Sequence, residues 1–90
     1  MIANMLSLSV SKHNKLINKI FRGNSDITPD EVIKILGILD FKAASTGGSH
    51  LTFRKPNCPS ITIVLTQNPV KPYILEKLRE ALINEGYQNE

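Results

Sequence analysis

Apolar residues recur at helical spacing in three stretches of the chain, residues 11–22, 28–40 and 72–85. Spacings of three to four residues place such residues on one face of a helix. The pattern therefore predicts three amphipathic helices, with apolar stripes formed by Leu16, Ile17, Ile20 and Phe21, by Val32, Ile35, Leu36 and Leu39, and by Ile74, Leu75, Leu78, Ala81 and Leu82.

The ends of two of these helices carry recognisable signals. Thr28 is a suitable N-cap, Pro29 suits the first helical position, and Glu31 completes a capping box. We expect this helix to close at Asp40. The last helix opens at Pro72 and is followed by Gly86, a residue typical of helix C-terminal stops.

Between the second and third helices the pattern changes to alternation, which is typical of strands. We predict strands over residues 41–45, 49–54 and 60–66, separated by a glycine turn at 46–48 and a proline-bounded connection at 56–59. In the middle strand Leu51 and Phe53 share one face. His50, Thr52 and Arg54 share the other.

The predicted order is α-α-β-β-β-α. Three short antiparallel strands need a covering layer, so we expect an α+β domain with helices packed on one face of the sheet. Residues 11–90 would form this single domain, and residues 1–10 a loosely ordered lead-in.

No stretch approaches the roughly 20 apolar residues of a membrane span. Cys58 is the only cysteine, which fits a reducing cytoplasm.

Charge adds a functional hint. The chain has 11 Lys and Arg against 8 Asp and Glu, a formal net charge of +3. Residues 41–75 contain no acidic residue but include Lys42, Arg54, Lys55 and Lys71. A segment of this kind is suited to a polyanion such as RNA.

His50 lies inside this positive segment, directly after Gly47-Gly48-Ser49. Imidazole has an unperturbed pKa near 6.5, so it can accept and donate a proton at neutral pH. It could activate the 2′-hydroxyl of RNA, which needs no metal or cofactor. The other interpretation is an exposed strand histidine without a catalytic function.

Three further features have two interpretations each. The Gly48 backbone and the Ser49 hydroxyl could contact phosphate, or could simply form a hairpin turn. Lys71 precedes a helix start, where phosphate binds readily, although lysines near helix starts are also frequent without such a function. We expect Lys42, Arg54 and Lys55 to lie near His50 and bind RNA; the alternative is a solvated basic rim.

Gly48-Ser49-His50, then Phe53-Arg54, a β-rich strand and a final helix introduced by Lys71-Pro72 resemble the HicA family of bacterial toxins over residues 28–87. The resemblance implies a double-stranded-RNA-binding-domain-like fold and cleavage of mRNA, with His50 as the catalytic residue. It also implies a HicB-type antitoxin partner that covers the active site.

The chain departs from the family pattern at one point. Many relatives carry a further histidine near the end of the third strand, where this chain reads Thr66-Gln67-Asn68-Pro69. With one histidine, the leaving 5′-oxygen would be protonated by His50 itself, by water or by a lysine. Two other functions fit the sequence, an RNA-binding module without catalysis and a protein-interaction domain.

Overall fold

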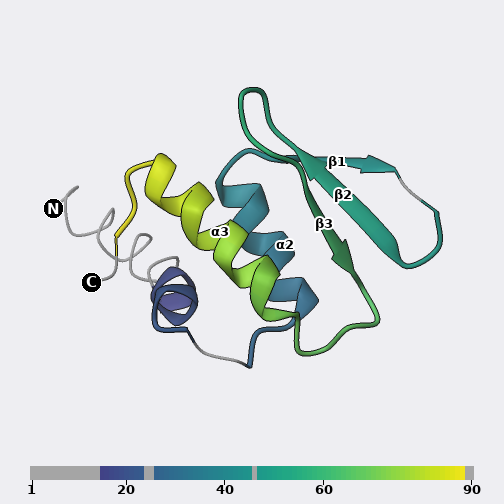
Figure 1. The fold of residues 1–90 in the computed structure, drawn as a ribbon, viewed down its shortest axis with the longest axis horizontal. Helices are drawn as coiled ribbons and strands as arrows, with labels where there is room; N and C mark the ends of the chain where they lie inside the picture. Colours follow the sequence, from purple (N-terminus) through teal and green to yellow (C-terminus); the bar gives the residue numbers. More distant parts are fainter. Residues whose placement is uncertain (1–14, 24–25, 46, 89–90) are drawn as a thin grey trace, which may run out of the picture.

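The computed structural model describes residues 15–23, 26–45 and 47–88. A helical segment over residues 15–21 comes first. It is followed by α2 (Pro29–Ile38), β1 (Lys42–Ser45), β2 (His50–Arg54), β3 (Ile61–Val64) and α3 (Pro72–Asn84) (Figure 1). The predicted α+β class and the order α-α-β-β-β-α are confirmed. The predicted lead-in at residues 1–10 lies outside the described residues.

The three strands form one antiparallel sheet in the order β1-β2-β3. His50 pairs with Val64, Thr52 with Thr62, and Lys42 with Arg54. Paired residues share a face. One face, here called the open face, therefore carries Lys42, Ala44, His50, Thr52, Arg54, Thr62 and Val64. The helices α2 and α3 lie on the other side of the sheet (Figure 1).

The core lies between that covered face and the helices. Phe53, Ile61 and Ile63 from the sheet are buried there together with apolar residues of α2 and α3. This is the face on which the alternation of the middle strand places Phe53. Within residues 15–88, apart from the undescribed gaps, no helix has the length and apolar character needed to cross a bilayer.

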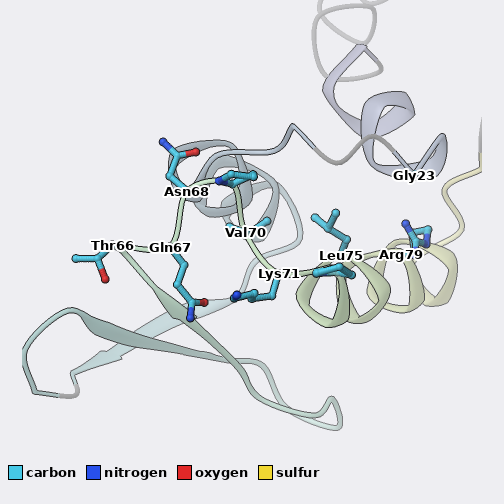
Figure 2. Close-up of a pocket in the computed structure, with 10 residues that line it drawn as sticks. Gly23, Thr66, Gln67, Asn68, Val70, Lys71, Leu75 and Arg79 are labelled. Carbon is cyan, nitrogen blue, oxygen red and sulfur yellow. The ribbon is translucent and has the colours of Figure 1, made fainter.

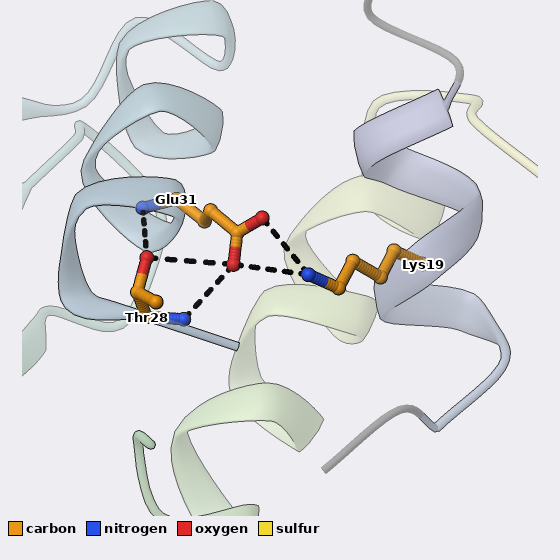
Figure 3. A network of polar contacts seen from close by, with 3 residues as sticks. All are labelled: Lys19, Thr28 and Glu31. Atoms are coloured by element: carbon orange, nitrogen blue, oxygen red, sulfur yellow. Dashed lines mark hydrogen bonds and ion pairs between the residues drawn. The ribbon is translucent and has the colours of Figure 1, made fainter. Parts of the chain in front are cut away.

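The segment 15–21 belongs to this core. Ile17 and Ile20 are buried as completely as the residues of α2. The Lys19 ammonium lies 3.0 Å from the Glu31 carboxylate on α2 (Figure 3). Arg79 of α3 donates a hydrogen bond to the Ile20 carbonyl at 3.2 Å. The residues before α2 therefore stabilise the domain.

The helix ends follow from local sequence. The Thr28 hydroxyl accepts from the Glu31 N–H at 3.2 Å, and the Thr28 N–H donates to the Glu31 carboxylate at 3.0 Å (Figure 3). This is the predicted capping box. At the other end Asp40 has φ 67°, its N–H donates to the Gly37 carbonyl at 3.1 Å, and the Phe41 N–H donates to the Leu36 carbonyl at 2.9 Å. These bonds form a Schellman motif.

The helices α2 and α3 run in the same direction along the molecule. The Val70 N–H donates to the Ile27 carbonyl at 2.8 Å, which joins the segments that lead into α3 and α2. At the far end, Lys55 contacts Leu39 after α2 and Glu85 after α3. We call these two regions the His50 end and the Lys55 end, because β2 begins at the first and leads to the second.

Candidate nucleic-acid interface

His50 is the first residue of β2 and is exposed to solvent. The turn before it brings the His50 N–H to 3.3 Å from the Gly47 carbonyl. Gly48 has φ 63°, and a Cβ added there would meet nothing within 4 Å. The left-handed backbone, and not crowding, therefore requires a glycine. The turn interpretation of this element is confirmed, and the space around it stays open to a ligand.

The loop that follows β3 lies beside this turn. The Leu65 N–H donates to the Ser49 carbonyl at 2.8 Å, and the Gln67 N–H donates to the Val64 carbonyl at 2.9 Å. Residues 65–71 then lead directly into α3. Consequently Ser49, His50 and Lys71 all lie at the His50 end of the sheet.

The starts of α2 and α3 differ although they lie at the same end. The start of α2 has a capping box and two acidic residues, Asp30 and Glu31, in its first turn. The N-cap of α3 is Lys71, which makes no side-chain capping bond, and the first turn of α3 has no acidic residue. A helix N-terminus carries partial positive charge. At the start of α3, the full positive charge of the Lys71 ammonium adds to this partial charge.

The two cations of the open face lie away from His50. Lys42 and Arg54 face each other across β1 and β2. Arg54 is four residues beyond His50 on β2, a separation of about 13 Å at the strand rise of about 3.3 Å per residue. The expectation that these cations surround the histidine is therefore corrected. Because like charges directly opposite each other repel, an anion lying over the pair would stabilise it.

Lys55 has a structural role that the sequence did not reveal. Its ammonium donates to the Leu39 carbonyl at 2.7 Å and to the Glu85 carboxylate at 2.8 Å, and lies 5.9 Å from the centre of the Phe41 ring. The hydrogen bond to Glu85 raises the pKa of Lys55, and this effect exceeds the opposing effect of desolvation. Lys55 therefore lies at the opposite end of β2 from His50, which corrects the expectation that it lies near the histidine, whereas RNA binding by Lys55 stays a prediction.

Between the two ends, the open face carries no charge. The hydroxyl oxygens of Thr52 and Thr62 lie 2.8 Å apart, and Thr52 is only 7% exposed. This hydroxyl pair satisfies both groups without a ligand. The Lys42 and Arg54 cluster is therefore separated from Lys71 at the His50 end, and the two clusters of positive charge do not form one continuous patch.

A hollow of about 570 Å³ lies at the His50 end, between the end of the 15–21 helix, the loop before α3 and α3 itself (Figure 2). The residues that line it include Gly23, Gln67, Asn68, Lys71, Leu75 and Arg79. The sequence analysis selected only Lys71 from this group. Leu75 and Arg79 follow Lys71 at helical spacing along α3, but Gly23 comes from a distant segment, so only the tertiary fold completes the hollow.

Cys58 is half-buried beside a smaller hollow of about 160 Å³, next to Phe41 and Ile61. It packs against the core, as an inert thiol would. Within the described residues, no group of three or more His, Cys, Asp or Glu side chains is placed to hold a metal ion.

Comparison with known proteins found no matching family model, no similar curated protein and no similar solved structure. Function is therefore inferred from the residues of this chain and from their geometry.

Proposed function

We propose that this protein is a metal-independent endoribonuclease that uses His50 as its general base. The observation that carries the proposal is the arrangement at the His50 end. An exposed histidine follows a glycine turn, and beside it a loop leads to Lys71 at a helix start without acidic residues. An imidazole for proton transfer and cations for phosphate are the groups that this reaction requires.

The reaction balances without a cofactor. The His50 imidazole accepts the proton of an RNA 2′-hydroxyl, and the oxygen attacks the adjacent phosphorus. The bond from phosphorus to the 5′-oxygen breaks, which leaves a 2′,3′-cyclic phosphate and a 5′-hydroxyl end. The proton required by the leaving oxygen comes from the His50 imidazolium, from water or from a lysine such as Lys71.

The surrounding groups would hold and neutralise the phosphates. The Gly48 N–H and the Ser49 hydroxyl lie in the turn before His50, and Lys71 is on the neighbouring loop. Charge that develops on the phosphate is stabilised by donors that are already in position. Lys42 and Arg54 would bind the strand about 13 Å away, so the open face would hold RNA at two points.

The biological setting follows from the resemblance of residues 28–87 to HicA toxins. On that basis the RNA is mRNA in the cytoplasm, and the protein is the toxin of a toxin–antitoxin pair with a HicB-type antitoxin. The α-β-β-β-α order of residues 29–84 agrees with the fold expected from that resemblance. Copurification of an endogenous partner encoded beside this chain would test the pairing.

The decisive experiment incubates a long RNA with the purified protein in EDTA. We expect cut products from the parent, and His50→Ala should slow cutting by about 10²- to 10⁴-fold, the usual contribution of general acid–base catalysis. His13→Ala is the matched control, because His13 is the other histidine of the chain. Circular dichroism checks that the fold survives.

Cutting by His50→Ala at the parent rate would refute the assignment. Cutting that stops in EDTA would refute the metal-independent mechanism.

A non-catalytic RNA-binding module is the second candidate. The observation that favours it is the Lys42 and Arg54 pair, which is positioned to hold phosphate far from the histidine. This function predicts strongly salt-dependent RNA binding with no cut products. The same incubation therefore separates the two candidates.

A further inference from the structure

The hollow at the His50 end has a composition that neither a simple anion site nor an apolar ligand site would have. It combines two cations, Lys71 and Arg79, with two side-chain amides, Gln67 and Asn68. Leu75, which is almost completely buried, supplies a small apolar surface. None of the described residues that line the hollow is acidic.

The polar groups approach this hollow from different sides. Figure 2 shows Gln67 and Lys71 extending on the side of the loop that faces the sheet. Arg79 lies on the opposite margin, toward Gly23, where it also holds the Ile20 carbonyl. An arginine has five N–H donors. A ligand in the hollow would therefore meet positive charge at both margins.

The loop is held in place at several points, so the hollow is a defined feature. The Leu65 N–H is bonded to Ser49 at its start, and the Val70 N–H is bonded to Ile27 near its end. The first of these bonds also joins the loop to the turn that precedes His50. A strand of RNA passing over the histidine would reach the hollow next.

We propose that this hollow binds one nucleotide of the RNA strand beside the scissile phosphate. The inference rests on the proposed function and adds a recognition site to it. Lys71 and Arg79 would hold the flanking phosphates. The amide of Gln67, which extends on the same side of the loop as Lys71 (Figure 2), would hydrogen-bond to the edge of the base, and Leu75 would contact its face.

Three properties favour a nucleotide over an acidic peptide. The volume of about 570 Å³ is within the range of small-ligand pockets, about 300–1,000 Å³. Side-chain amides offer paired donors and acceptors that match base edges. Cations alone would suffice for carboxylates, whereas the amides and the apolar surface match a base.

The test uses the full chain carrying His50→Ala, so that bound RNA is not cut. The probe is a fluorescent single-stranded RNA of roughly 12 nucleotides, a length within the usual site size of single-strand binders. Anisotropy over a range of salt concentrations gives the affinity and the slope of log K against log salt. Lys71→Ala should weaken binding about three- to tenfold and reduce the magnitude of the slope by about one.

Gln67→Ala tests base recognition separately from charge. It should reduce the difference in affinity between oligo-A, oligo-U, oligo-C and oligo-G probes and leave the salt slope unchanged. Lys77→Ala is the matched control, an exposed lysine on the same helix that does not line this hollow. It should leave the base preference unchanged and affect binding much less than Lys71→Ala.

Nuclear magnetic resonance locates the contact directly. The side-chain amide signals of Gln67 and Asn68 should shift when the RNA probe is added. A shift with a mononucleotide as well would show that one nucleotide suffices, and a shift with the oligomer alone would show that the strand is needed. No shift with either would overturn the proposal, as would equal affinity in Lys71→Ala, Gln67→Ala and the control.

Two further results separate this inference from the proposed activity. If the chain with His50 intact cuts RNA, and Lys71→Ala and Gln67→Ala cut at the same rate and positions, nucleotide binding in the hollow is refuted together with the phosphate contact assigned to Lys71, while His50 as general base is retained. If RNA binding depends on Lys71 but the parent never cuts RNA, the proposed nuclease activity is refuted, and nucleotide binding in the hollow is retained. Displacement of RNA by polyglutamate at similar strength would overturn the nucleotide assignment.

Discussion

The two ends of the sheet use positive charge in opposite ways. At the Lys55 end, a lysine lies where α2 and α3 both end, and it contacts the Leu39 carbonyl and the Glu85 carboxylate. Helix C-termini carry partial negative charge, so a cation there is satisfied within the protein. At the His50 end both helices begin, and Lys71 adds its charge to a helix start without acids.

The difference shows why a count of cations does not locate a binding site. Lys55 and Lys71 belong to the same acid-free stretch of sequence. One is surrounded by acceptors of its own fold, and the other is exposed beside a hollow. Positive charge is available to a ligand only where the fold does not already neutralise it.

The largest effect on stability is expected from Lys55→Met, which keeps the apolar stem and removes the ammonium. The Leu39 carbonyl and Glu85 would each lose a donor, so we expect the melting temperature to fall by several degrees. The rate of RNA cleavage at permissive temperature should be retained. Thermal unfolding followed by circular dichroism measures the first quantity.

Lys42→Met is the matched control, because Lys42 is an exposed lysine close to this end but on the open face. It relieves repulsion with Arg54, so its melting temperature should stay the same or rise. If Lys55→Met and Lys42→Met had equal stability, the contrast between a structural and an available cation would fail.

A smaller effect is expected from the threonine pair that separates the two charged clusters. Thr52→Val leaves the Thr62 hydroxyl without its partner at 2.8 Å, which should cost about 1 kcal/mol of unfolding free energy. The double variant Thr52→Val/Thr62→Val removes both hydroxyls and should cost less than the sum of the single variants. Urea unfolding of all four proteins measures this coupling, and strict additivity would contradict it.

The smallest effect is expected at the start of α2, where the Glu31 carboxylate lies at the helix N-terminus. Burial alone raises the pKa of Glu31, but hydrogen bonds from the Thr28 backbone and from Lys19 outweigh it and hold the pKa below the ordinary 4.5. The charged form therefore adds stability above pH 4.5, and this stability is lost as the pH falls through the lowered pKa.

Glu31→Gln keeps a residue that can complete the capping box and removes only the charge. It should cost less than about 1 kcal/mol at pH 7, as is usual for a partly exposed ion pair. The difference from the parent should shrink as the pH falls below 4.5 and the Glu31 carboxylate is protonated. Urea unfolding at pH 7 and pH 3 tests this, and a difference that grows on acidification would contradict the assignment.

Much of the local structure could be predicted because its causes lie within a few residues. The Thr28 to Glu31 capping box, the stop at Asp40 and the turn at Gly48 each depend on backbone rules that act over one turn. Strand bounds were less accurate. The third strand ends at Val64 and not at Thr66, because the Gln67 N–H bonds back to the Val64 carbonyl and the chain then turns toward α3.

The sequence by itself determined the order of elements, the buried face of β2 and the position of His50 after a left-handed glycine. These properties follow from periodicity and local hydrogen bonding. Only the tertiary structure decided that Lys55 is neutralised within the fold and that Gln67, Lys71 and Arg79 border one hollow. Those relations join residues up to 30 positions apart, and the packing of helices and sheet sets the distances between the most widely separated of them.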